Sequence, residues 1–195
     1  MRRSRYYCVL ILLLLSACHS RYPQPANQYM VAFADGYYQL YPGWPAPARQ
    51  LLQHIVWHSA QGTQEFLLSA MLTEQQILLI ATSALGHELW RLQYSQQGIV
   101  QLNGIEPFNQ PEIALRILAE MQLALLPLPV IQPRLHQLQL TEQYTGQYQR
   151  QLLNHQQQTL LDIYWQEPAE IPTQVNIQQQ YYQLTITTLQ QELLP

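Results

Sequence analysis

The chain has 195 residues, nine arginines, no lysine and twelve acidic residues, which gives a net charge of −3. This acidic, lysine-free composition argues against nucleic acid as a partner, because phosphate backbones are bound by clustered basic side chains. The length suits one domain with a substantial core.

The first 18 residues have the layout of a secretory signal. Three arginines precede an apolar run over residues 6–15. At about ten residues the run falls short of the ~20 that span a bilayer, so we predict a cleaved signal peptide over residues 1–17. The closing sequence Leu15-Ser16-Ala17-Cys18 resembles the bacterial lipobox, which implies that Cys18 is acylated and begins the mature chain. The alternatives are an ordinary signal peptide containing a cysteine, or an uncleaved anchor.

A lipidated Cys18 would anchor the protein to a membrane without crossing it, since each buried methylene contributes about 0.8 kcal/mol. His19 follows in place of the Asp that retains lipoproteins at the inner membrane, so the resemblance implies the periplasmic face of the outer membrane. The mature chain has six arginines against twelve acidic residues, and we expect membrane contact through lipid and apolar side chains instead of a basic patch. Cys8 leaves with the signal, so no thiol remains for a disulfide or a nucleophile.

Residues 18–47 are rich in proline and tyrosine and show little periodicity. Because prolines block regular structure, we predict a tether here that lifts a single domain, residues 48–195, off the membrane. The aromatic part of this segment, Tyr37 to Trp44, is either packed on the domain or an exposed contact site for another protein.

Short runs bounded by turn residues follow, and their spacing predicts an antiparallel meander. The first five predicted strands cover residues 49–58, 63–72, 76–82, 87–94 and 99–102. Five more cover residues 138–140, 147–153, 159–165, 173–178 and 181–189. The run at 76–82 is nearly continuous in apolar residues, as expected of a strand covered on both faces.

Between the two groups of strands the hydrophobic period becomes that of a helix. Pro111 suits a first helical turn and Glu112 favours its positive end. Apolar residues then recur at helical spacing up to Leu125, and Pro127 ends the helix. The apolar exit after it is either core or the rim of a pocket. The order predicts an α+β fold in which one strongly curved antiparallel sheet of about ten strands wraps around a mid-chain helix.

The stretch Leu78 to Leu102 resembles the LolB family of outer-membrane lipoprotein receptors, because a strand ends in the turn Ser83-Ala84-Leu85-Gly86 and a hairpin follows at similar spacing. The resemblance implies a half-open barrel with a helical lid, shared with LolA, and a cavity that holds lipoprotein acyl chains. It also implies a soluble LolA-like periplasmic donor as a candidate partner. In LolB the tip leucine inserts into the membrane, and Leu85 occupies that place. Ala84 stands where LolB has proline, which leaves open whether Leu85 protrudes or packs beneath its turn.

Later segments resemble an uncharacterised family of bacterial outer-membrane lipoproteins with a LolB-like fold. Members of that family are often encoded beside aryl polyene or fatty-acid-like biosynthesis enzymes. The segments that carry this resemblance are Leu123 to Pro129, Arg150 to Leu153, Leu160 to Tyr164 and Tyr182 to Thr187.

The residues indicate no catalytic, metal or cofactor site. No serine lies in a nucleophile elbow and no glycine-rich phosphate loop occurs. His54 and His58 share a strand face but lack the glutamate of a zinc-protease motif, so a surface or pocket-lining pair is expected. Asp162 lies in an apolar strand, where a buried carboxylate needs a partner. The candidates for a structural ion pair with it are Arg91, Arg116, Arg134 and Arg150.

Together these features predict a non-enzymatic lipoprotein that binds acyl chains or another long apolar ligand and assists its transfer to or from the membrane. One alternative is a structural lipoprotein with a filled core that recruits another envelope protein through Tyr37 to Trp44. A second is an enzyme acting on lipid or glycan through an unrecognised site. The predicted cavity lining comes from the sheet and the lid: Leu68, Leu78, Ile80, Trp90, Leu92, Ile117, Met121 and Leu125.

Overall fold

The structure is a computed structural model that describes residues 30–167 and 169–195. The predicted signal peptide and Cys18 lie outside these residues. The strands of the larger sheet are β3 (Arg49–Ser59), β4 (Gly62–Leu72), β5 (Gln76–Thr82), β6 (Glu88–Ser95), β7 (Gly98–Gly104), β9 (Leu138–Tyr144), β10 (Tyr148–Asn154), β11 (Thr159–Trp165), β12 (Gln174–Gln178) and β13 (Tyr182–Leu193).

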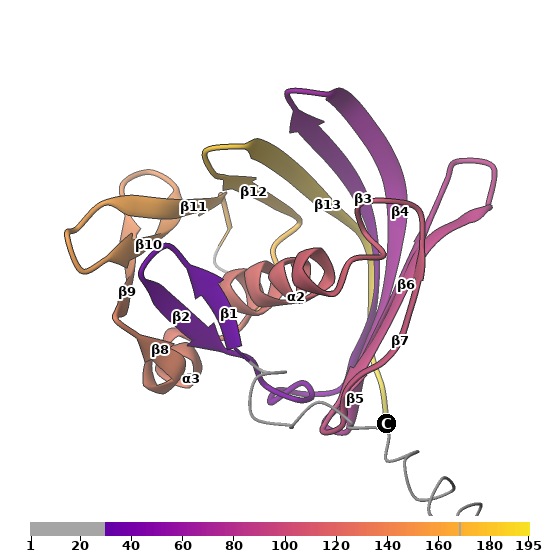
Figure 1. Cartoon of the computed structure of the whole chain (residues 1–195), viewed down its shortest axis with the longest axis horizontal. Helices are drawn as coiled ribbons and strands as arrows, with labels where there is room; N and C mark the ends of the chain where they lie inside the picture. The colour runs from indigo at the N-terminus through magenta and orange to yellow at the C-terminus, as the bar shows by residue number, and fades with distance from the viewer. Residues whose placement is uncertain (1–29, 168) are drawn as a thin grey trace, which may run out of the picture.

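The described residues thus place ten strands in one antiparallel sheet, in the order β7-β6-β5-β4-β3-β13-β12-β11-β10-β9. The last strand, β13, pairs with β3 from Tyr182↔Ser59 to Leu193↔Arg49, and this pairing joins the two meanders. The sheet curves strongly around the mid-chain helix and stays open between β7 and β9 (Figure 1). The predicted fold class, a half-open curved sheet with an inserted helix, is confirmed.

The helix α2 (Pro111–Leu125) has the predicted bounds, with Pro111 in its first turn and a cap at Leu126. It lies on the concave side of the sheet, so most of its surface is covered. Two polar side chains, Glu120 and Gln122, are therefore buried in its second half. No helix among the described residues has the length and apolar character that crossing a bilayer requires.

The chain leaves α2 through the short helices α3 (Leu128–Ile131) and η3 (Gln132–Arg134). Ile131 is fully buried, and Leu128 and Val130 pack against the same core. The apolar exit after the helix is therefore core, not the rim of a pocket.

A second sheet corrects the predicted tether. Residues 30–39 form β1 (Met30–Phe33) and β2 (Gly36–Gln39), which are joined by β8 (Leu135–His136) in the order β1-β2-β8. Val31, Phe33, Tyr38, Leu40 and Trp44 belong to the buried core. Residues 30–47 are thus part of the folded domain. Their buried side chains hold this proline-rich segment in place, although its sequence has no regular hydrophobic period.

The aromatic part of this N-terminal segment is fastened to the domain by polar contacts. The Gln122 side chain accepts from the Tyr38 hydroxyl at 3.2 Å and exchanges two 3.1 Å hydrogen bonds with the backbone of Tyr41. Gly43 lies so close to the β4–β5 turn that a Cβ there would be 1.9 Å from the Glu74 carbonyl oxygen. Tyr37 to Trp44 therefore packs on its own domain, and the alternative of an exposed contact site is wrong.

Candidate functional site

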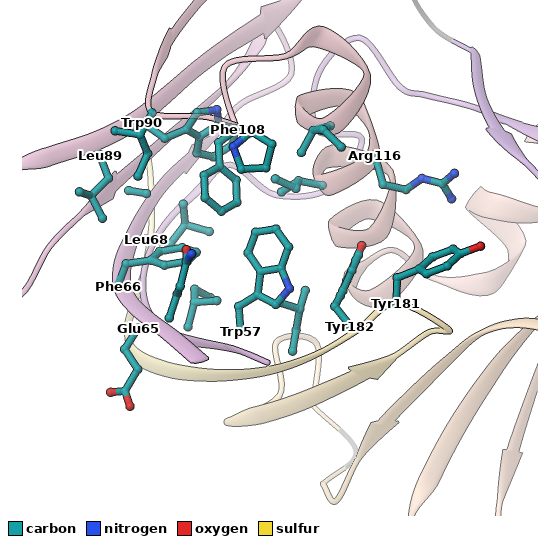
Figure 2. Close-up of a pocket in the computed structure, with 18 residues that line it drawn as sticks. Trp57, Glu65, Phe66, Leu68, Leu89, Trp90, Phe108, Arg116, Tyr181 and Tyr182 are labelled. Atoms are coloured by element: carbon teal, nitrogen blue, oxygen red, sulfur yellow. The ribbon is translucent and has the colours of Figure 1, made fainter. Parts of the chain in front are cut away.

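An apolar cavity of about 360 Å³ separates α2 from the concave face of the sheet (Figure 2). We call it the Trp57 cavity. Side chains from five strands, the β7–α2 loop, α2 and the β12–β13 turn line it: Ile55, Trp57, Gln64, Glu65, Phe66, Leu68, Ala81, Leu89, Trp90, Ile105, Pro107, Phe108, Ile113, Arg116, Ile117, Tyr181, Tyr182 and Leu184. Its size falls in the range of small-ligand pockets, about 300–1,000 Å³.

Aromatic rings form the wall around Trp57. Its indole meets Phe108 edge-on at 4.8 Å between ring centroids and Tyr182 at 5.4 Å. Phe108 also lies 6.1 Å from Phe66 and 6.4 Å from Trp90. These spacings are typical of favourable aromatic pairs, so the rings support one another around a space that none of the described side chains fills.

Strand alternation explains which residues face the cavity. Successive side chains point to opposite faces of a sheet, so Ile55 and Trp57 of β3 face inward together. Phe66 and Leu68 of β4 face the same way. On α2, Ile117 is only half-buried because it faces the cavity instead of the packed core.

The structure divides the predicted lining residues into three groups. Leu68, Trp90 and Ile117 line the cavity. Leu92 and Met121 are buried in the core, Leu125 packs against it, and none of the three is among the lining residues.

Leu78 and Ile80 require a correction. They lie half-buried on the outer face of β5, between the inward-facing residues Ile77, Leu79 and Ala81. The continuous apolar run concealed this alternation, and Ala81 is the β5 residue that reaches the cavity. Sequence reasoning also missed Trp57, although the alternation of residues 51, 53, 55 and 57 contained the signal.

Few polar groups face the cavity. The Nε1 atoms of Trp57 and Trp90 are buried and have no hydrogen-bond partner among the described residues. The Glu65 carboxylate and the Arg116 guanidinium extend away from the centre at opposite ends of the lining (Figure 2). Glu65 lies 3.3 Å from Nε2 of His54 on the outer face of the sheet. The centre of the cavity therefore suits hydrocarbon.

A buried carboxyl group links α2 to the wall of the cavity. Glu120 is 2% exposed, and the Tyr182 hydroxyl lies 2.7 Å from both of its oxygens. The Gln179 amide donates to Oε1 at 3.3 Å. Burial raises the pKa of Glu120 from 4.5 to about 7, while the hydrogen bond from Tyr182 and the charge of Arg116 act in the opposite direction. Burial and the neighbouring Glu120 also raise the pKa of Tyr182.

The β5–β6 turn projects an apolar side chain beside the cavity. Leu85 is 85% exposed at its tip, so the alternative that it packs beneath the turn is wrong. The turn is closed by backbone hydrogen bonds from Ser83 to His87 and from Gly86 to Ser83, both 2.9 Å, without the proline of LolB. β6 starts directly after this turn, and its residues Leu89 and Trp90 line the cavity.

The remaining candidates do not form a chemical site. The His58 Nδ1 contacts the Thr63 hydroxyl at 2.8 Å, and His54 contacts Glu65 as described above. The described residues contain no group of three or more metal-ligating side chains. The predicted ion pair between Asp162 and an arginine is wrong. The Oδ1 atom of Asp162 instead accepts hydrogen bonds from the side-chain amides of Gln149 at 3.0 Å and Gln151 at 2.8 Å.

Comparisons with known proteins give one family match and distant structural likenesses. The model of the family described as "Protein of unknown function (DUF3261)" matches residues 50–190. No curated protein matches the chain by sequence.

Two solved structures are distantly similar. A LolA superfamily protein from Nitrosomonas europaea gives a TM-score of 0.38 at 7% identity, covering 79% of this chain and 89% of that one. A domain named for outer membrane lipoprotein sorting, from Vibrio parahaemolyticus, gives 0.36 at 6% identity, covering 75% and 85%. Similarity at this level gives no residue-by-residue correspondence.

Proposed function

We propose that this chain, which belongs to the DUF3261 family of proteins of unknown function, binds a long apolar chain in the Trp57 cavity and assists its transfer to or from a membrane without bond chemistry. Family membership supplies no activity, so the proposal rests on one observation. That observation is an apolar cavity of about 360 Å³ between α2 and the sheet. Hydrocarbon held in the cavity is kept from water, which stabilises it by about 25 cal/mol per Å² of buried apolar surface. A carrier needs this free energy to hold an apolar chain outside a membrane.

The proposal includes the location predicted from the lipobox resemblance. Acylated Cys18 would hold the domain at the periplasmic face of the outer membrane, with Leu85 as the point of contact with lipid. The alternative of a filled core has no support among residues 30–167 and 169–195, because their side chains do not fill the Trp57 cavity and Tyr37 to Trp44 packs on the domain itself.

Filling the cavity tests ligand binding directly. In Ala81→Phe the new ring enters the Trp57 cavity between Leu68 and Trp90, its partners on the flanking strands. We expect the affinity for N-phenyl-naphthylamine, an uncharged fluorescent probe, to fall about tenfold or more, because the ring occupies the volume that the probe needs. Fluorescence titration of the full chain in nanodiscs, with empty nanodiscs as the blank, measures it.

The matched control is Ile80→Phe, one residue away on the outer face of β5. It should bind the probe as the wild type does. Equal affinity of all three proteins, or no binding by the wild type, would contradict the proposed function.

The role of Leu85 at the exposed tip is tested by the rate of ligand transfer to a membrane instead of by ligand affinity. We expect Leu85→Glu to fold normally and bind the probe, but to deliver it to lipid vesicles several-fold more slowly, because a charged side chain resists insertion into hydrocarbon. Stopped-flow fluorescence measures the transfer rate. Val100→Glu changes a 53% exposed apolar residue on the edge strand β7 and serves as the control. An unchanged rate in Leu85→Glu would remove this residue from the mechanism.

A further inference from the structure

A second cavity adjoins the Trp57 cavity and has a different character. It measures about 630 Å³ and is lined by both polar and apolar side chains: Phe33, Ala34, Arg116, Thr159, Leu160, Leu161, Asp162, Gln178, Gln179, Gln180 and Tyr181. Arg116 and Tyr181 line both cavities. An apolar compartment therefore meets a polar one at these two residues.

Arg116 brings to this junction a positive charge that has no ion-pair partner among the described residues. It is half-buried, its Nη2 donates to the Ala32 carbonyl oxygen at 2.5 Å, and its Cζ lies 3.9 Å from the centre of the Phe33 ring. No carboxylate among residues 30–167 and 169–195 lies within 4.0 Å of its guanidinium nitrogens. A guanidinium has five N–H donors, so several stay available for an anion.

The other described arginines are committed elsewhere. Arg49 pairs with Glu170, Arg91 with Glu88, and Arg150 with Glu142. Arg134 has no ion-pair partner among the described residues, but its guanidinium stacks over the Tyr41 ring at 3.5 Å and lines neither cavity.

Glu120 lies one helical turn after Arg116 on α2, and Asp162 lines the second cavity with it. Glu120 is held by Tyr182 and Gln179, and burial favours its uncharged form. Asp162 also lines the second cavity, but its Oδ1 is engaged by two glutamine amides. Neither carboxyl group forms an ion pair with Arg116.

We propose that the ligand is a single-chain amphiphile with a terminal carboxylate, its hydrocarbon in the Trp57 cavity and its head group on the Arg116 guanidinium. This inference rests on the proposed function and narrows its ligand class. Planar guanidinium and carboxylate groups match in a bidentate pair. The cavity volume lies near the lower end of the ligand-pocket range and suits one acyl chain instead of several. The neutral ester- and amide-linked chains of a lipoprotein would leave Arg116 unpaired.

Brominated oleate and brominated methyl oleate test the head group. Both should quench tryptophan fluorescence of the full chain in nanodiscs, because Trp57 and Trp90 line the cavity. After correction for partition into empty nanodiscs, we expect the carboxylate to bind about tenfold more tightly than its ester, as a charge-assisted pair would give. The preference should weaken as salt rises.

Variants at Arg116 test whether this side chain causes the preference for the carboxylate over the ester. In Arg116→Gln the ratio of the two affinities should fall to about one, whereas Arg116→Lys keeps the charge and should retain a preference. Arg134→Gln should keep the wild-type ratio. A cooperative unfolding transition shows that each variant is folded.

Three outcomes would overturn the head-group proposal: equal affinities in the wild type, a preference for the ester, or a carboxylate preference that survives in Arg116→Gln. Binding of the ester alone would leave the proposed function standing. A wild type that binds neither these ligands nor the uncharged naphthylamine would remove both.

Discussion

Replacing Arg150 with methionine is expected to lower the free energy of unfolding by about 3–5 kcal/mol, the usual result of breaking a buried charge pair from one side. Arg150 is 7% exposed, and its Nε donates to Glu142 at 2.5 Å. Its Nη1 donates to the carbonyl oxygens at the end of α2, those of Leu123 at 2.9 Å, Ala124 at 3.1 Å and Leu126 at 2.8 Å. The last carbonyls of a helix have no partner within the helix.

Methionine would fill much of the same space but would leave these oxygens and the Glu142 carboxylate without their donor. Because Arg150 lies on β10, its loss would also detach the end of α2 from the sheet. Urea unfolding followed by circular dichroism gives the free energy. Arg91→Met, which removes the exposed pair with Glu88, is the control and should have a small effect. Equal effects of the two substitutions would show that the end of α2 does not depend on Arg150.

The second large effect is a loss of stability at rising pH that depends on Glu120. Its pKa is raised to about 7 in the folded protein, against 4.5 in the unfolded chain. Because the folded protein holds this proton more tightly than the unfolded chain, Glu120 contributes its full stabilisation below pH 4.5. This contribution is lost as the pH rises through about 7. The difference corresponds to about 3 kcal/mol.

Glu120→Gln isolates this contribution, because the amide cannot ionise and still offers Tyr182 an oxygen. The variant should gain stability relative to the wild type, by about 3 kcal/mol, between pH 4.5 and pH 8. Denaturant titrations across this range measure the difference. Glu112 lies in the exposed first turn of the same helix, so the stability of Glu112→Gln should change with pH as that of the wild type does. A difference between Glu120→Gln and the wild type that does not change with pH would show that Glu120 is not buried in its protonated form.

The larger sheet was predictable because its signals are local. Turn residues delimit β3 to β7, and proline marks both ends of α2. Membership of an uncharacterised family, inferred from segments such as Arg150 to Leu153, is confirmed. Lipidation of Cys18, the outer-membrane location and the tip role of Leu85 stay predictions.

The lining of the cavity was only partly predictable. Hydrophobicity identifies Leu68 and Leu78 equally well, yet only Leu68 faces the cavity. In an apolar run such as β5 both faces carry apolar residues, so the pattern does not tell which face is concave. Phe108 lies in a loop, where no periodicity operates, and only the fold brings it to Trp57.

By itself the sequence determined the strand and helix segments, because turn chemistry and hydrophobic period act between neighbours in the chain. The tertiary structure decided the rest. It placed five side chains of residues 30–47 in the core: Val31, Phe33, Tyr38, Leu40 and Trp44. It also brought Arg150 to the carbonyl oxygens at the end of α2, surrounded Asp162 with two glutamine amides, and left Arg116 without an ion-pair partner among the described residues at the junction of two cavities. These outcomes depend on contacts between residues far apart in sequence, whose geometry is fixed only when the open sheet curves around α2.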